Sequence, residues 1–406
     1  MPAPLPPLRV AVYALALNER ANVERFMASC AGADLVVVAD TGSTDGTPEA
    51  LSGAGAMVHR IAVSPWRFDD ARNATLALVP HDIGVCVSLD MDEVLSPGWR
   101  DLLDRAWVPG TTRVRYPYVW SHSADGAPAV RFYAEKIHAR HGYRWRAPCH
   151  EGLFPDRIDP RTVTVEDLRI DHWPDASKPR SEYLPLLEAA VREDPDDARS
   201  AHYYARELFF HARHAVAEAE FHRHLALPGA IWGLERCASM RYIAKCRIAL
   251  GDLRGAASWL RQACIEAPEA RDPWVDLAEA LYLLEDWVGC RDAAIRALLI
   301  RQATADYIND PRSDGPLPHD LASIAAWRMG LREEALLHAE AAASVDPRDG
   351  RLADNVVTIR KIIERGRETP VPPCDAAGAA GAAAPRLPQA ADHPGAWWEH
   401  RHPASN

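Results

Sequence analysis

The sequence lacks several features that would each have pointed to a class of protein. No apolar run approaches the roughly 20 residues that a membrane-spanning helix needs. The first nine residues contain no basic segment followed by an apolar core, so they do not predict a secretory signal. The formal net charge is −11, whereas nucleic-acid-binding domains are usually basic. We therefore expect a cytoplasmic protein with no transmembrane segment and no nucleic-acid partner.

Closely spaced cysteines are also missing. The eight cysteines are scattered and none forms a CxxC pair, which argues against a zinc ribbon or a dithiol redox site. Most lie in apolar surroundings, as Cys86 does between Val85 and Val87. They are typical of small core residues in a reducing compartment.

A chain of 406 residues exceeds the size at which one hydrophobic core usually stops growing. The sequence changes character twice, which predicts two domains and a tail. Residues 1–175 alternate strand-like and helix-like segments, and residues 181–366 are helical and rich in alanine and leucine. Residues 367–406 are rich in proline, alanine and glycine, which predicts a disordered tail.

The first hundred residues predict an α/β domain. Four apolar runs, at residues 10–15, 35–40, 57–63 and 83–90, alternate with helical segments. Continuous apolar strands of this kind predict a Rossmann-like, mostly parallel sheet with helices on both faces. Shorter β-like runs follow at residues 114–119, 130–133, 143–145 and 163–170. They are consistent with additional antiparallel strands or with one side of a cleft.

The helical part repeats itself. Leu250-Gly251-Asp252 and Leu284-Glu285-Asp286 are 34 residues apart, and each lies between two alanine-bearing helical segments. Less regular copies are centred near residues 210–212 and 329–331. The period and the small residues are typical of tetratricopeptide repeats, so we expect an all-α repeat domain that binds a protein partner or forms a homodimer.

The end of the fourth apolar run carries three carboxylates in four residues. Asp90 and Asp92 are spaced so that both side chains lie on one side of an extended segment, and Glu93 follows directly. Hard oxygen ligands favour Mg²⁺ or Mn²⁺, and such ions retain open positions for substrate phosphates. The alternative is an acidic turn that caps the next helix.

The second apolar run also ends in a carboxylate. Asp40 opens into the loop Thr41-Gly42-Ser43-Thr44-Asp45-Gly46-Thr47, whose glycines allow close backbone approach to a ligand. We expect Asp40 to contact a nucleobase, and Ser43 and Asp45 to line the same pocket. An ordinary βα loop would contain the same residue types, and Asp45 has an equal claim to bracing that loop.

These motifs resemble family 2 glycosyltransferases with the GT-A fold. The resemblance rests on residues 16–19, 35–47, 66–73 and 89–93, which follow one another in the order found in that family. A GT-A domain followed by tetratricopeptide-like helices also resembles bacterial glycosyltransferases with C-terminal repeats. Both resemblances weaken between residues 111 and 173.

The resemblance implies a role for each matching position. Asp40 would contact the base, and Asn18 and Glu19 would line the donor pocket. Asp90 and Asp92 would hold the metal and the diphosphate. Arg72 and Asn73 match the Arg-Asn pair on the helix that faces the donor, and a histidine, His172 or His150, would complete the metal shell. A helix-surface salt bridge with Asp69 or Asp70 is an equally good explanation of Arg72.

The catalytic base departs from the family pattern. No Glu-Asp pair occurs between residues 111 and 150, where the family commonly supplies one. The best local candidate is Glu151, in Cys149-His150-Glu151-Gly152. A loop ion pair or a helix cap would explain His150 and Glu151 equally well.

The leading hypothesis is a metal-dependent, inverting glycosyltransferase that uses Mn²⁺ or Mg²⁺ and a UDP-sugar or similar donor. Its acceptor would be a saccharide, a peptide or a protein. The alternative is a catalytically inactive scaffold that binds a protein partner. A nucleotidyltransferase is a third possibility, but the loop at residues 16–19 is neither glycine-rich nor basic as a triphosphate-binding loop would be.

Overall fold

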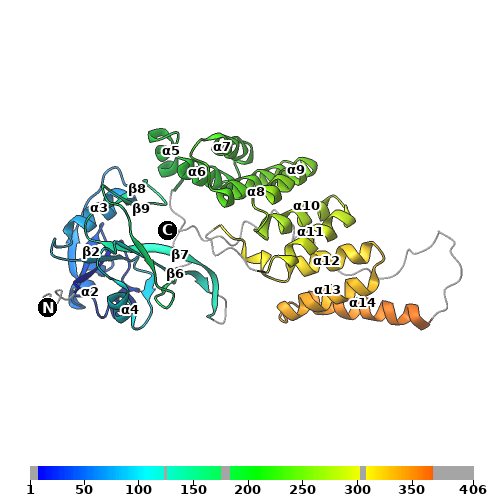
Figure 1. Ribbon diagram of the computed structural model, residues 1–406, viewed down its shortest axis with the longest axis horizontal. Coiled ribbons are helices and arrows are strands. Elements are labelled where there is room, and N and C mark those ends of the chain that lie inside the picture. The colour runs from blue at the N-terminus through cyan, green and yellow to red at the C-terminus, as the bar shows by residue number, and fades with distance from the viewer. Residues whose placement is uncertain (1–7, 123–125, 175–182, 302–307, 369–406) are drawn as a thin grey trace. The chain divides into compact units, whose positions relative to one another are not determined.

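The computed structural model describes residues 8–122, 126–174, 183–301 and 308–368. These residues form two compact units, the first ending at Glu193 and the second beginning at Asp194 (Figure 1). The expected disordered tail lies almost entirely outside the described residues, so it remains a prediction. Within the described residues no helix is both long enough and apolar enough to cross a membrane.

The first unit is built on a nine-stranded mixed sheet with the order β3-β2-β1-β4-β7-β6-β11-β5, in which β10 pairs with β6. Strands β3, β2, β1 and β4 are parallel to one another, and β7 joins β4 and β6 in antiparallel pairings. The strands are β1 (Val10–Ala16), β2 (Leu35–Asp40), β3 (Met57–Arg60), β4 (Val85–Ser88), β5 (Glu93–Leu95), β6 (Arg113–His122), β7 (Pro128–Ala139), β10 (Thr162–Thr164) and β11 (Ile170–His172).

Both faces of this sheet are covered, as the apolar strands predicted. Val12 and Val38 belong to a core that includes residues of α1 (Val23–Ser29), α2 (Thr47–Gly53) and α4 (Trp99–Ala106). On the other face, Tyr13 and Val37 pack with residues of α3 (Phe68–Leu78) and with a separate hairpin of β8 (Tyr143–Arg146) and β9 (Gly152–Pro155). The parallel part of the predicted α/β domain is therefore confirmed, within a sheet that is mixed.

Two strands differ from the sequence prediction. Residues 163–170 do not form one strand, because the chain turns at Glu166 and Asp167 and divides the segment between β10 and β11. Strand β3 ends at Arg60 instead of residue 63. In contrast, β6 and β7 extend the main sheet with antiparallel pairing, which was one of the two arrangements that the sequence left open.

Helix α5 (Tyr183–Glu193) belongs to the first unit, whereas the sequence assigned residues from 181 onward to the repeat domain. The physical reason is local. The ring of Tyr183 lies 6.3 Å from that of Phe68 and 5.7 Å from that of His150. Glu193 forms an ion pair of 2.6 Å with Arg67.

The second unit is a stack of antiparallel helix pairs, which confirms the predicted all-α repeat architecture (Figure 1). Buried alanines, including Ala244, Ala257, Ala278 and Ala293, allow the paired helices to approach closely. The helices are α6 (Ala198–Phe210), α7 (His214–Ala226), α8 (Gly233–Ala249), α9 (Leu253–Glu266), α10 (Asp272–Leu283), α11 (Trp287–Leu299), α12 (Leu317–Arg328), α13 (Arg332–Val345) and α14 (Gly350–Glu368).

The turn inside each pair has the same backbone conformation. The second residue after the first helix is left-handed in all four pairs, with φ of 55° at Ala212, 87° at Gly251, 57° at Glu285 and 79° at Gly330. A left-handed residue at this position closes a helix and reverses the chain. The shared turn shows that the two irregular copies, near residues 210–212 and 329–331, follow the same plan as the two regular ones.

Candidate functional site

Polar side chains gather at the carboxyl ends of β1, β2 and β4. Strand β1 lies between β2 and β4, so the chain crosses the sheet in opposite directions on its two sides. Ligands of open α/β sheets bind at such a point, beyond the carboxyl ends of the strands. The loop after Ala16, the loop after Asp40 and the acidic segment after Ser88 all emerge there.

The first two loops are joined by side-chain to backbone hydrogen bonds. Asn18 has a φ of 54°, a left-handed conformation that non-glycine residues adopt mainly where surrounding contacts hold it. The bonds run from Asn18 N–H to Ser43 Oγ (2.8 Å), Thr44 N–H to Asn18 Oδ1 (2.9 Å), Glu19 N–H to Thr47 Oγ1 (2.8 Å) and Arg20 N–H to Asp45 Oδ2 (3.0 Å). The structure thus brings together the residues that were expected to form the donor pocket.

Asp40 and Asp45 both brace the second loop. The carboxylate of Asp40 accepts hydrogen bonds from the N–H groups of Gly42 (3.2 Å) and Ser43 (3.2 Å), and the residue is completely buried. Asp45 accepts bonds from the hydroxyl (2.5 Å) and the N–H (3.0 Å) of Thr47, and the first of these is the main reason that its pKa is lowered. The bracing role considered for Asp45 is present, and the base contact of Asp40 remains a prediction.

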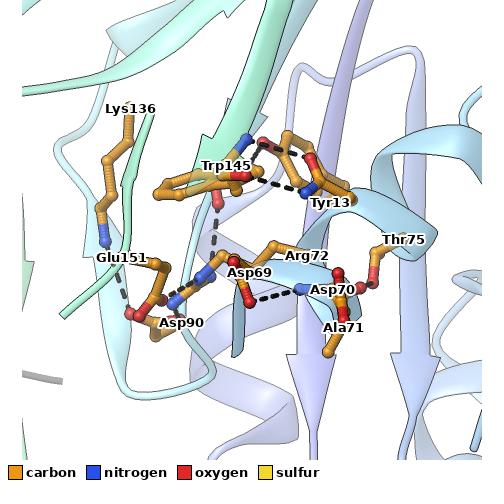
Figure 2. Close-up of polar contacts among 12 residues, drawn as sticks. Tyr13, Asp69, Asp70, Ala71, Arg72, Thr75, Asp90, Lys136, Trp145 and Glu151 are labelled. Atoms are coloured by element: carbon orange, nitrogen blue, oxygen red, sulfur yellow. Dashed lines mark hydrogen bonds and ion pairs between the residues drawn. The ribbon is translucent and has the colours of Figure 1, made fainter. Parts of the chain in front are cut away.

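Arg72 is the centre of the polar contacts on the α3 side of the sheet (Figure 2). Its Nη2 donates to Oδ1 of Asp90 at 2.8 Å, and its Nε donates to Oε1 of Glu151. The guanidinium lies 5.0 Å from the ring centroid of Trp145, and Nη1 is 3.5 Å from Oγ of Ser88. Arg72 therefore pairs with Asp90 and Glu151, two of the predicted site residues, and not with Asp69 or Asp70.

A second cation, Lys136 of β7, lies beside Asp90 and Glu93. Its Nζ lies 2.5 Å from Oε1 of Glu93 and 3.4 Å from Oδ2 of Asp90. Tyr118 donates its hydroxyl proton to the same Glu93 oxygen at 2.6 Å. Asp90 is thus held between Arg72 and Lys136.

The two neighbouring carboxyls have opposite pKa shifts. Burial would raise the pKa of Asp90, but the charges of Arg72 and Lys136 and the Arg72 hydrogen bond hold it well below its usual value. Burial raises the pKa of Glu93, and the charge of Asp90 adds to that effect. Burial would lower the pKa of Lys136, yet Glu93 and Asp90 keep it raised, so Lys136 remains charged.

Asp92 contacts His172 and does not share the partners of Asp90. Oδ2 of Asp92 lies 3.2 Å from Nε2 of His172, while Nδ1 of His172 lies 3.0 Å from the carbonyl oxygen of Trp120. That carbonyl fixes the proton on Nδ1, which leaves the Nε2 lone pair directed at a carboxylate. Two acceptors at this distance require a proton or a cation between them. Burial would lower the pKa of His172, but the Asp92 hydrogen bond and charge raise it, so a proton fills this role.

The donor set of Asp92 and His172 fits a small divalent ion. Mg²⁺ and Mn²⁺ are commonly held by one or two protein ligands, with water and substrate phosphates in the other positions. Of the three predicted metal ligands, the structure pairs Asp92 with His172 and directs Asp90 to Arg72 and Lys136. Within the described ranges no three His, Cys, Asp or Glu side chains form a ready-made metal cluster.

Asn73 joins helix α3 to strand β8. Its side-chain amide donates to the carbonyl oxygen of Trp145 (2.9 Å) and accepts from the N–H of Trp145 (3.0 Å). These two bonds fasten β8 to α3 and position the indole ring beside Arg72. The other histidine considered, His150, packs against the ring of Tyr183.

Three residues of this site were not predicted from the sequence. Lys136 and Tyr118 contact the acidic segment, and the ring of Trp145 lies against the Arg72 guanidinium. Lys136 lies in a strand that also contains Arg131, Glu135 and His138, so nothing in the local pattern marks it. Only the antiparallel pairing of β7 with β4 and β6 places it beside the acidic segment.

The comparisons with known proteins concern the helical part. No protein-family model matches the chain, and no protein of curated function matches it. Among solved structures, the chain is similar to YrrB, described as a TPR protein with an unusual peptide-binding site, with 16% identity, a TM-score of 0.37, and coverage of 46% of this chain and 87% of that one. It is also similar to MamA (11% identity, TM-score 0.34, coverage 41% and 89%). A third structure is a thermophilic TPR protein of Thermus thermophilus (18% identity, TM-score 0.30, coverage 44% and 89%).

Proposed function

We propose that the first unit is a metal-dependent glycosyltransferase of GT-A type that takes a sugar from a nucleotide-sugar donor. The observation that carries the proposal is the contact between Asp92 and His172 at the carboxyl edge of the sheet. A carboxylate and an imidazole that share a proton, which a divalent ion can replace, lie beside a loop suited to a nucleotide, and such an enzyme requires both parts. The comparisons contribute nothing to this proposal.

Each residue has a defined task in this proposal. Asp92 and His172 would hold Mn²⁺ or Mg²⁺, which when bound supplies positive charge to the diphosphate leaving group. Arg72 provides a second cationic group for the phosphates. Asn18, Glu19, Asp40, Ser43 and Asp45 shape the pocket for base and ribose. Glu151 takes the proton of the acceptor hydroxyl, and direct displacement by that hydroxyl inverts the anomeric centre.

Ligand-dependent thermal stability tests the proposal. We expect UDP with Mn²⁺ to raise the melting temperature, because a ligand that binds only the folded state stabilises it. Asp92→Asn and His172→Ala should abolish the shift, while Asp70→Asn, an exposed carboxylate on α3, should retain it. Each nucleotide diphosphate is tested in turn, and hydrolysis of the matching nucleotide-sugar is followed in parallel. No shift with any nucleotide in the presence of Mn²⁺ would contradict the proposal.

The second candidate is a scaffold without catalysis that binds a protein partner through the helix pairs. The observation that favours it is the ion pair between Arg72 and Glu151, because Arg72 occupies a carboxylate oxygen that a base would use to take the proton of the acceptor. A complementation experiment separates the two functions. If a gene carrying Asp92→Asn restores the phenotype of a deletion strain as well as the wild-type gene does, the scaffold is the better explanation.

A further inference from the structure

Arg72 is shared between two carboxylates that depend on it to different degrees. Asp90 has a second cationic neighbour, because Lys136 lies 3.4 Å from its other oxygen. Among the ion pairs of the described residues, Glu151 has Arg72 as its cation, and the Glu151 side chain is only 6% exposed. Removal of Arg72 would therefore leave Asp90 paired and Glu151 buried without a counter-ion.

The loop that carries Glu151 is held in a strained conformation. Ala147 has a φ of 81° and His150 a φ of 52°, both in the left-handed region. Each such residue costs about 1–3 kcal/mol and persists only when surrounding contacts enforce it. Two contacts hold the loop. The N–H of Phe68 donates a hydrogen bond of 3.0 Å to the carbonyl oxygen of Pro148, and Arg72 forms an ion pair with Glu151.

We infer that Arg72 is a latch that keeps Glu151 paired until a nucleotide phosphate draws the guanidinium away. The inference rests on the proposed function and adds an order of events to it. A phosphate carries more charge than a carboxylate and accepts a guanidinium in a bidentate manner, so it competes well for Arg72. Asp90 keeps Lys136 throughout, and the phosphate charge is shared with the divalent ion.

This exchange makes Arg72 a positioning residue for Glu151. Before the nucleotide binds, the Glu151 carboxylate is paired with Arg72, and this ion pair helps to hold the strained loop in place. Afterwards the carboxylate is released to accept a proton from the acceptor. The acceptor is therefore activated only when the donor is in place, which limits reaction of the base in the absence of donor.

Hydrogen exchange of the backbone amides of residues 149–152 tests the latch without an acceptor. UDP with Mn²⁺ should make these amides exchange about tenfold faster in the full chain, because local opening becomes easier once the ion pair is broken. Calorimetry on the same samples measures whether UDP binds. Binding with unchanged or slower exchange would overturn the latch and leave the proposed function standing, whereas absence of binding would overturn both.

Three variants separate the latch from a general loosening of the fold. Glu151→Gln cannot form the ion pair, so exchange should be fast without nucleotide and UDP should add little, while UDP affinity is retained. Arg72→Lys keeps the charge but not the bidentate geometry, and should reduce the UDP-induced increase by at least half. Arg67→Lys, at the start of the same helix but paired with Asp69 and Glu193, should respond as wild type does. An unaltered UDP response in Arg72→Lys and Glu151→Gln would overturn the latch.

Discussion

The indole N–H of Trp145 donates a hydrogen bond of 2.8 Å to the hydroxyl oxygen of Tyr13, between residues far apart in the sequence. Tyr13 in turn donates to Nε2 of His138 at 2.9 Å, and Nδ1 of His138 lies 2.8 Å from the carbonyl oxygen of Ala139. Each hydrogen bond in this series has a defined donor: Trp145 donates to Tyr13, and Tyr13 donates to His138. The series fixes the position of the Trp145 ring, over which the Arg72 guanidinium lies (Figure 2).

Replacement of Tyr13 by phenylalanine should therefore be costly. It leaves the Trp145 N–H and the His138 ring nitrogen buried without a partner, and we expect a loss of about 2–4 kcal/mol in the free energy of unfolding. Urea denaturation followed by tryptophan fluorescence measures the loss. Tyr143→Phe removes a single hydrogen bond, to Thr112, and should cost about half as much. Equal losses of stability in Tyr13→Phe and Tyr143→Phe would mean that the hydrogen bonds through Tyr13 contribute no more than a single hydrogen bond does.

Acid should destabilise the first unit through His138. Burial lowers the pKa of His138 to about 4, so the unfolded chain binds a proton at a higher pH than the folded chain does. The stability from this group is complete above pH 6.5 and is lost as the pH falls toward 4, by at most about 3 kcal/mol. In His138→Gln we expect a smaller decrease in stability between pH 6.5 and 4 than in wild type. Parallel curves would contradict this assignment.

The second unit should show the opposite pH dependence through Glu279. Burial, together with the charges of Asp276 and Asp310, outweighs the charge of Arg312 and raises the pKa of Glu279 to about 7. The folded chain then holds a proton that the unfolded chain releases, so stability is greatest below pH 4.5 and is lost as the pH rises to 7. Glu279→Gln should flatten the stability curve between pH 5 and 8. Glu340→Gln, on the surface, should not change it.

Substitution of the buried Asp40 tests whether its carboxylate stabilises the loop after β2 or recognises a nucleobase. Asp40→Asn replaces one of the two oxygens that accept the loop N–H groups, and we expect a loss of about 1–2 kcal/mol without any ligand present. Asp45→Asn changes an exposed side chain and should cost less. Thermal denaturation without nucleotide measures both losses. Unchanged stability of Asp40→Asn, with loss of UDP binding, would show that Asp40 serves the ligand and not the loop.

The left-handed turns of the repeat unit predict a stabilising substitution. Glu285 has a φ of 57° where the equivalent residues of two other pairs are Gly251 and Gly330. Glu285→Gly should raise stability by about 0.5 kcal/mol, since relief of the left-handed strain exceeds the entropy cost of glycine. Gly251→Ala should lower stability by about 1 kcal/mol through strain alone, because a Cβ at that position meets no atom within 4 Å. A decrease for Glu285→Gly would mean that its side chain makes a stabilising contact.

The strand ends were predictable because their signal is local. Apolar runs that stop at Asp40 and just before Asp90 predict buried strands with acids at the carboxyl edge, and the structure has β2 end at Asp40 and β4 at Ser88. The 34-residue period likewise predicted paired helices with buried alanines. The extent of the first unit was not predictable, because α5 is as helical and alanine-containing as the repeats that follow it.

The partners of the site residues were not predictable, because they lie far away in the sequence. Arg72 and Glu151 are 79 residues apart, Asn73 and Trp145 are 72 apart, and Lys136 and Asp90 are 46 apart. Arg72 has Asp69 and Asp70 within one helical turn, and local spacing favours them as partners. Tertiary packing turns the side chain toward Asp90 instead.

The sequence by itself determined which segments are buried, where the acids follow the strands and how often the helices repeat, because each follows from the periodicity of neighbouring residues. Only the tertiary structure decided that Asp92 faces His172, that Lys136 supports Asp90 and that Arg72 holds Glu151. These pairings depend on strand order and register, which bring distant segments together and decide which charge each side chain meets.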